Sequence, residues 1–212
     1  MKTSNIIITA IVLFFFAISL TAMIEIRNNK STTDEGSSCN NKEHAIKEPF
    51  SVIFVQEGKT EIVASNENKI NCCNNSDYKI SNDTLIINTE NNVKIEAVNI
   101  KSVVAKSRQR IKLKKIKTGN FSIKLTNTYL DCDRCNIDTL YIKLKDSRIS
   151  GIFNDNKTKS MFIDADNSNV YFDVKTEKCK IKYRNESNVT IGSTKDLEVK
   201  SDDKTCMLHV MR

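Results

Sequence analysis

The sequence predicts an all-β chain in which most residues form a single-stranded parallel β-solenoid, or β-helix-like, domain. Two observations carry this prediction. Apolar and polar residues alternate at a period of two from Phe50, Val52 and Phe54 onward, as in strands with one buried face, and no helical period competes with them. The second half of the chain also repeats itself at the length of one solenoid coil.

The repeated unit is a strand that ends in a small polar turn, as in FSIKLTNT, LYIKLKDS, MFIDADNS, CKIKYRNES and LEVKSDD. Its equivalent apolar positions, at steps of 19, 21, 18 and 18 residues, are Ile123, Ile142, Ile163, Ile181 and Val199. We expect these side chains inside each coil and residues such as Lys124, Lys143 and Asp164 outside. An antiparallel sandwich would show the same alternation, but few glycines and no Asn-Gly or Asp-Gly turns disfavour tight hairpins.

Residues 1–27 are expected to form an N-terminal transmembrane anchor. The stretch from Ile6 to Ile24 carries no charge and has the length that a bilayer-spanning helix needs. A cleaved signal peptide is the alternative, but its apolar region is usually shorter, and Ala22 has Leu20 two positions before it instead of a small residue. An uncleaved signal anchor predicts a single-pass protein of a bacterial cell membrane whose C-terminal domain is extracytoplasmic.

Polar residues dominate 28–48, so we expect a flexible spacer there, followed by the solenoid domain over 49–212. Within that domain the opening FSVIFVQEGKTEIVA, the DTLIINT segment from Asp83 and the later strand-and-turn units resemble the auto-transporter adhesin head GIN domain family of Bacteroidota. The resemblance covers about Phe50 to Val210. It implies a β-solenoid in the cell envelope, and it supplies no catalytic residues.

The positive charge of the chain is concentrated in one region. Between Ala97 and Leu130 there are nine Lys or Arg residues and no acidic residue. Five of these bases occupy alternate positions of one predicted strand: Lys106, Arg108, Arg110, Lys112 and Lys114. The pattern predicts a basic stripe that could bind anionic lipid headgroups or acidic glycan, whereas a solvated face that discourages edge pairing would look the same. Nucleic acid is disfavoured because no aromatic residues interleave the bases.

Three acidic residues are the candidates for glycan chemistry. Asp164 and Asp166 are expected to point outward side by side, and Asp173 follows. Such a pair could raise one carboxyl pKa or hold Ca²⁺, which keeps a carbohydrate-binding or carbohydrate-active solenoid as an alternative function.

Seven cysteines and two histidines offer little further chemistry. Cys132 and Cys135 form a C-x-x-C motif, so a thiol redox or metal-binding protein is a second alternative. The alternation instead places Cys132, Cys179 and Cys206 in the core as small apolar residues. Histidine occurs only at positions 44 and 209, so the chain has too few histidines for the catalytic sites of serine hydrolases or zinc hydrolases.

The sequence therefore predicts a non-enzymatic, membrane-anchored envelope protein with an adhesin-like or structural solenoid domain, and with no catalytic residue, cofactor or metal ligand assigned.

Overall fold

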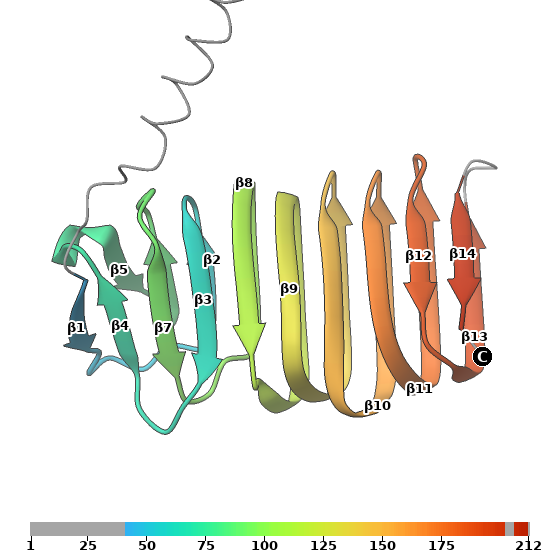
Figure 1. The fold of residues 1–212 in the computed structure, drawn as a ribbon, viewed down its shortest axis with the longest axis horizontal. Helices are drawn as coiled ribbons and strands as arrows, with labels where there is room; N and C mark the ends of the chain where they lie inside the picture. The colour runs from blue at the N-terminus through green and yellow to red at the C-terminus, as the bar shows by residue number, and fades with distance from the viewer. Residues whose placement is uncertain (1–40, 202–205, 212) are drawn as a thin grey trace, which may run out of the picture. The chain divides into compact units, whose positions relative to one another are not determined.

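The structure, a computed structural model, describes residues 41–201 and 206–211, without the side chains of 154–157. It confirms an all-β solenoid (Figure 1). Except for one short 3-10 helix, η1, the elements are strands. In chain order they are β1 (Lys42–Ala45), β2 (Val52–Val55), β3 (Lys59–Ala64), β4 (Lys69–Cys72), η1 (Asn75–Asp77), β5 (Tyr78–Ser81), β6 (Thr84–Ile87), β7 (Val93–Ala97), β8 (Ser102–Lys114), β9 (Lys117–Lys145), β10 (Arg148–Asp166), β11 (Asn169–Arg184), β12 (Asn188–Ile191), β13 (Thr194–Ser201) and β14 (Met207–Val210).

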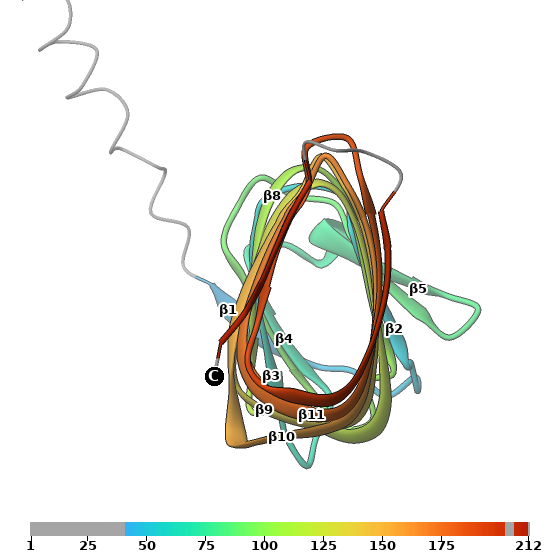
Figure 2. The same ribbon diagram turned by 90° about the vertical axis from the view of Figure 1, so that its right-hand side faces the viewer.

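The chain winds around a closed cross-section whose two long sides are β-sheets (Figure 2). The sheet facing the viewer in Figure 1, here called the front sheet, has the order β1-β4-β7-β3-β8-β9-β10-β11-β12-β14. The other, here called the back sheet, contains β5, β6, β2 and β13 and is completed by the remaining parts of β8 to β11. The long strands β8 to β11 therefore pass from one sheet to the other around a corner.

Pairing between coils is parallel and keeps the register that the repeat predicts. Ile163 pairs with Ile142 of the coil before and with Ile181 of the coil after, and Ile181 pairs with Val199. All of these side chains except Val199 are buried, and Val199 lies on the last back-sheet strand. The core is thus a series of stacked apolar layers, one layer per coil.

The corner that leads into the front sheet explains why the chain needs so few glycines. Most of its residues with positive φ are asparagine or aspartate, namely Asn127 (51°), Asp146 (51°), Asn167 (45°) and Asn185 (52°), and the others are Ser107 (73°) and Glu186 (60°). Asparagine and aspartate tolerate this conformation better than other residues with a side chain. They replace the glycines that tight turns elsewhere require.

A buried hydroxyl follows this corner in each coil and satisfies backbone groups there. The hydroxyl ladder consists of Thr128, Ser147, Ser168 and Ser187, all nearly inaccessible to solvent. The Thr128 amide donates to the Ser147 hydroxyl at 3.1 Å, the Ser147 amide to Ser168 at 3.0 Å, and the Ser168 amide to Ser187 at 3.1 Å. Buried backbone groups need such partners, so the small polar turns of the sequence fasten each coil to the next.

The N-terminal end differs from the prediction. Strand β1 lies within the segment expected to be a spacer, and it pairs antiparallel with β4. Ile46, which directly follows β1, is buried at the edge of the core. Residues 42–46 of the expected spacer are therefore part of the solenoid domain.

The expected anchor at Ile6 to Ile24 lies outside the described residues. Among the residues that are described, the structure contains no helix with the length and apolar character needed to span a membrane.

Candidate functional site

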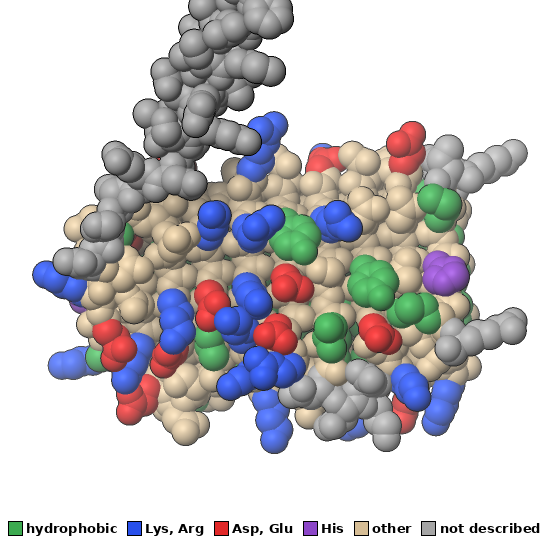
Figure 3. Space-filling view, viewed as in Figure 1, with side chains coloured by type: hydrophobic (Ala, Val, Ile, Leu, Met, Phe, Trp, Pro, Cys, Tyr) green, Lys and Arg blue, Asp and Glu red, His purple; other side chains and the backbone are tan. Residues whose placement is uncertain are grey.

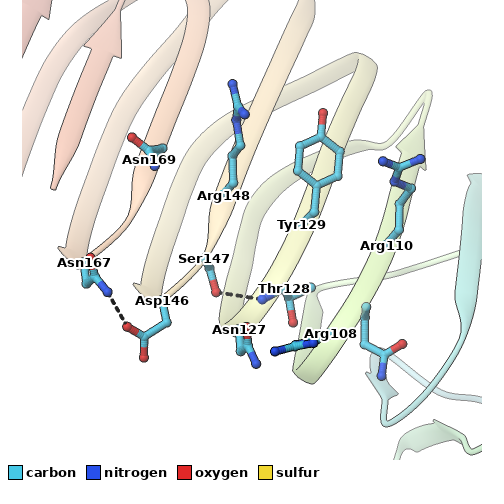
Figure 4. Close-up of a pocket in the computed structure, with 11 residues that line it drawn as sticks. Arg108, Arg110, Asn127, Thr128, Tyr129, Asp146, Ser147, Arg148, Asn167 and Asn169 are labelled. Carbon is cyan, nitrogen blue, oxygen red and sulfur yellow. Dashed lines mark hydrogen bonds between the residues drawn. The ribbon is translucent and has the colours of Figure 1, made fainter. Parts of the chain in front are cut away.

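The front sheet carries a shallow groove of about 510 Å³ over β8, β9, β10 and the start of β11 (Figure 4). We call it the arginine groove, and its defining residues are Arg108, Arg110, Asn127, Tyr129, Arg148 and Asn169. In Figure 3, Lys and Arg side chains gather over the N-terminal and central strands of this face, and hydrophobic side chains over its C-terminal half. The groove lies where these two regions meet.

Coil stacking brings the groove residues together from distant parts of the chain. Arg110 pairs with Tyr129, Tyr129 with Arg148, and Arg148 with Asn169. Since paired strands lie about 4.8 Å apart, Arg110 and Arg148 stand about 10 Å apart on either side of Tyr129. The Arg110 guanidinium lies 5.4 Å from the centroid of the Tyr129 ring, within the range of a cation–π contact.

The prediction that the five bases form one straight stripe is wrong. Ser107 has a φ of 73°, and the register shifts between Lys106 and Gln109, because β8 turns its corner there. Lys106 lies instead with its Nζ 5.7 Å from the centroid of the Phe54 ring, and Lys114 pairs with Glu61 at 2.8 Å. Arg108, Arg110 and Lys112 remain on the groove side of the corner.

The three arginines of the groove have no ion-pair partner among the described residues. The acidic residue closest in the lining, Asp146, accepts a 2.7 Å hydrogen bond from the Asn167 amide (Figure 4). The groove therefore combines uncompensated guanidinium groups with asparagine amides. Guanidinium groups bind phosphate and carboxylate through paired hydrogen bonds, so the arrangement fits an anion.

Sequence reasoning identified Arg108 and Arg110 but missed Tyr129, Arg148 and Asn169. The signal was present, because the 19-residue step from Ile123 to Ile142 also leads from Arg110 to Tyr129 and from Tyr129 to Arg148. Applying the repeat to outward residues as well as to core residues would have found the groove.

The acidic candidates do not form one site. Asp164 and Asp166 both lie on the back sheet, as the alternation predicts, and Arg184 holds both: its Nη1 lies 2.8 Å from Asp164 Oδ1, and its Nε lies 3.2 Å from Asp166 Oδ2. Asp173 lies at the end of the β11 segment that pairs with Ile152 on the front sheet. Two carboxylates that share one guanidinium form a structural ion-pair cluster, in contrast to the free acid and base that glycoside hydrolysis uses.

This cluster makes stability depend on acid pH. The Asn185 amide, which donates a 2.6 Å hydrogen bond to Asp166, lowers the pKa of that carboxyl, and Arg184 and Lys145 act in the same direction against the effect of burial. Because the folded pKa lies below the unfolded one, the carboxylate stabilises the fold above the ordinary aspartate pKa of about 4, and this contribution is lost as the pH falls through the folded value.

We therefore expect the free energy of unfolding of Asp166→Asn to fall less steeply below pH 4 than that of the wild type, as measured by urea unfolding across pH. In Asn185→Ala, which lacks the hydrogen bond that lowers the pKa of Asp166, the loss of unfolding free energy should begin at a higher pH than in the wild type. Identical pH slopes in all three proteins would show that the Asp166 carboxylate does not contribute.

The cysteines of the C-x-x-C motif both point into the core, although alternation predicted this only for Cys132. Arg134 has a φ of 55°, so the chain turns a corner between the two thiols. Their mutual hydrogen bond, together with burial, raises the pKa of Cys132, while the same bond lowers the pKa of Cys135. With exposures of 1% and 0%, neither thiol is accessible to a partner protein.

The other cysteines within the described residues also have structural positions, and Cys39 lies outside those residues. Burial raises the pKa of Cys179 to about 12, as expected for a core thiol. Cys72 is buried, Cys206 is partly buried, and Cys73 is disulfide-bonded. Within residues 41–201 and 206–211, no three His, Cys, Asp or Glu side chains come together as metal ligands.

The fold is similar to that of solved proteins from Bacteroidales. A "putative adhesin" from Bacteroides fragilis NCTC 9343 matches with a TM-score of 0.55 and 10% identity, covering 81% of this chain and 96% of that one. A "putative lipid binding protein" from Parabacteroides distasonis ATCC 8503 has a TM-score of 0.51 and 12% identity, with 82% and 95% covered. A "putative adhesin" from Parabacteroides merdae ATCC 43184 has a TM-score of 0.50 and 12% identity, with 81% and 95% covered.

No family model matches the chain, and no curated protein matches it. At this level of identity the likeness to solved structures establishes the fold. The chain therefore has the β-solenoid fold seen in these Bacteroidales proteins.

Proposed function

We propose that this protein is a non-enzymatic, membrane-anchored module of the bacterial cell envelope that binds anionic phospholipid headgroups in its arginine groove. The observation that carries the proposal is the set of three arginines, Arg108, Arg110 and Arg148, that lack an ion-pair partner among the described residues and converge on one groove. Each cation near an anionic membrane surface contributes about 1 kcal/mol to binding.

Further points support this function. The fold neighbours bear the names adhesin and lipid binding protein, and the sequence resembles the head GIN domain family of the Bacteroidota envelope. The disulfide of Cys73 suits an oxidising compartment. An anchor at Ile6 to Ile24 would keep the domain beside a membrane, which raises its effective concentration at the lipid surface.

Planar guanidinium groups favour phosphate over neutral headgroups because they donate two parallel hydrogen bonds to its oxygens. Asn127 and Asn169 flank the arginines and add amide donors. The exposed edge of Tyr129, set between Arg110 and Arg148, suits a membrane interface, where tyrosine is enriched.

Replacing Arg108, Arg110 and Arg148 by Gln should weaken binding of the protein to phosphatidylglycerol vesicles by about two orders of magnitude. Three contacts of about 1 kcal/mol each are lost. Co-sedimentation at low salt measures the effect. Binding of the wild type should fall as salt rises, because exposed charges are screened.

The matched control changes the same number of charges elsewhere: Lys79, Lys178 and Lys195, all exposed, are replaced by Gln. This variant should retain more than half of the wild-type free energy of binding to the phosphatidylglycerol vesicles. Inorganic phosphate added as a competitor separates the possible sources of the anion, since displacement at low millimolar concentration would assign the groove to free phosphate. Equal loss in both triple variants would reduce the effect to net charge and refute the groove.

A further inference from the structure

The back sheet carries a second surface feature, on the side of the solenoid away from the arginine groove. Tyr141 of β9 and Phe162 of β10 are paired in register, and their rings stack with centroids 5.0 Å apart and planes 8° from parallel. Tyr141 is 46% exposed, a large fraction for an aromatic side chain on a packed sheet. The pair forms an apolar platform that the fold leaves open to solvent.

A shallow depression of about 390 Å³ adjoins this platform, and its lining includes Ser122, Tyr141 and Phe162. Ser122 holds the position of Tyr141 in the preceding coil, one residue before the repeated isoleucine. Phe162 covers one face of the Tyr141 ring, whereas on the side of Ser122 the small side chain leaves the other face accessible. The depression therefore forms because a small serine in one coil lies beside a large tyrosine at the equivalent position of the next coil.

Lysines line the same depression in the neighbouring columns. Lys124 and Lys143 lie beside Ser122 and Tyr141, and neither has an ion-pair partner among the described residues. Lys180, which pairs in register with Phe162, binds Glu198 at 2.8 Å. The one acidic residue in the lining, Asp164, pairs in register with Lys143, but its carboxylate is bound by Arg184 at 2.8 Å. Neither Lys124 nor Lys143 is therefore in ion-pair contact with a carboxylate of the described residues.

We propose that this surface, the Tyr141 platform, binds an acidic saccharide, with the apolar C–H face of one sugar ring against the exposed face of Tyr141 and its carboxylate between Lys124 and Lys143. An aromatic ring carries negative charge on its face, which attracts the polarised C–H groups of a sugar. The two ammonium groups supply the charge that selects a uronic acid over a neutral sugar.

An added peptide strand does not fit this site. The strands that carry it, in β9, β10 and β11, are hydrogen-bonded to neighbours on both sides, and strand addition requires a free edge. The sugar ligand and the back sheet both differ from the lipid and the front sheet of the proposed function, so the two sites stand or fall separately.

The test measures binding of trigalacturonate and of its methyl ester, which keeps the sugar rings and lacks the charge, by isothermal titration calorimetry on the soluble domain. The wild type should bind the acid at least tenfold more tightly than the ester. Tyr141→Ala and the double variant Lys124→Gln/Lys143→Gln should each weaken binding of the acid about tenfold. Tyr141→Leu, which keeps an apolar side chain without the aromatic face, should weaken it similarly and serves if the alanine variant misfolds.

Two controls distinguish this site from the arginine groove. Lys178→Gln removes a charge from β11 of the same sheet, outside the depression, and should leave trigalacturonate binding unchanged. Arg108→Gln/Arg110→Gln/Arg148→Gln should also bind trigalacturonate normally whatever it does to vesicle binding. Equal affinity for acid and ester, undiminished binding in the platform variants, or loss of vesicle binding in place of saccharide binding in Lys124→Gln/Lys143→Gln would each overturn the proposal.

Discussion

Gly192→Ala should destabilise the domain by about 3 kcal/mol, because an added methyl group would meet backbone that cannot move aside. Gly192 lies in the corner between β12 and β13, and its amide donates a 2.8 Å hydrogen bond to the Phe172 carbonyl. A Cβ there would overlap the Val174 carbonyl oxygen and lie 2.7 Å from its carbonyl carbon and 2.8 Å from its nitrogen. Relief would require two coils to separate, which would break the register of the sheet.

The matched control is Gly119→Ala, also in this glycine-poor chain. A Cβ at Gly119 would meet nothing within 4 Å, so the change should alter stability by less than about 1 kcal/mol, and in the stabilising direction because it restricts the unfolded chain. Urea unfolding of both variants measures the difference. If the two substitutions shift the midpoint equally, then the close approach of coils at Gly192 is not a constraint on the fold.

Ser168→Ala should cost about 2 kcal/mol through the loss of one rung of the hydroxyl ladder. The Ser168 hydroxyl accepts the Ser147 amide at 3.0 Å and donates to the Asp166 carbonyl at 2.6 Å. Alanine fills nearly the same space but leaves the buried Ser147 amide without its acceptor, and the Asp166 carbonyl keeps only the hydrogen bond from the Asp146 amide at 3.0 Å. The penalty is therefore one of desolvated polar groups, with little change in packing.

Ser160→Ala is the comparison for Ser168→Ala, since the Ser160 hydroxyl makes no hydrogen bond with the described part of the chain and is partly exposed. It should change the free energy of unfolding by less than about 0.5 kcal/mol, so that the urea midpoint and the m-value stay close to those of the wild type. A Ser168→Ala midpoint that matches that of Ser160→Ala would mean that water replaces the missing hydroxyl.

The coil repeat was predictable from sequence because the same spacing fixes both burial and pairing. Ile142, Ile163, Ile181 and Val199 pair as the repeat predicts, and Asp164 and Asp166 point outward as alternation predicts. Each of these results depends on a period that many residues share. A single substitution would not have hidden it.

The parts that sequence reasoning missed depend on single residues. The corner at Ser107 divides the basic stripe, and serine gives no signal of the positive φ that asparagine and aspartate indicate at the later corners. Arg134 likewise turns Cys135 inward against the alternation. At the N-terminal end no repeat exists, so the antiparallel pairing of β1 with β4 and of β5 with β6 could not be inferred from spacing.

The front-sheet groove and the Tyr141 platform were missed for a related reason. Both are built from outward residues of successive coils, and outward positions follow no composition rule because solvent accepts any polar or small residue there. The register between coils alone determines which residues form each of these two surfaces. Tyr129 and Ser122 acquire their surroundings only once the coils are stacked.

The stacking of coils also bears on how the chain folds in time. Along the hydroxyl ladder the hydrogen-bonded residues are only 19 or 21 positions apart, whereas at the N-terminal end Gln109 reaches back 53 positions to the Gln56 carbonyl. Closing the longer loops costs more chain entropy and slows folding. Synthesis must therefore reach β8 before the N-terminal third can close, and from there each further stretch of about 20 residues can add one coil to a finished edge.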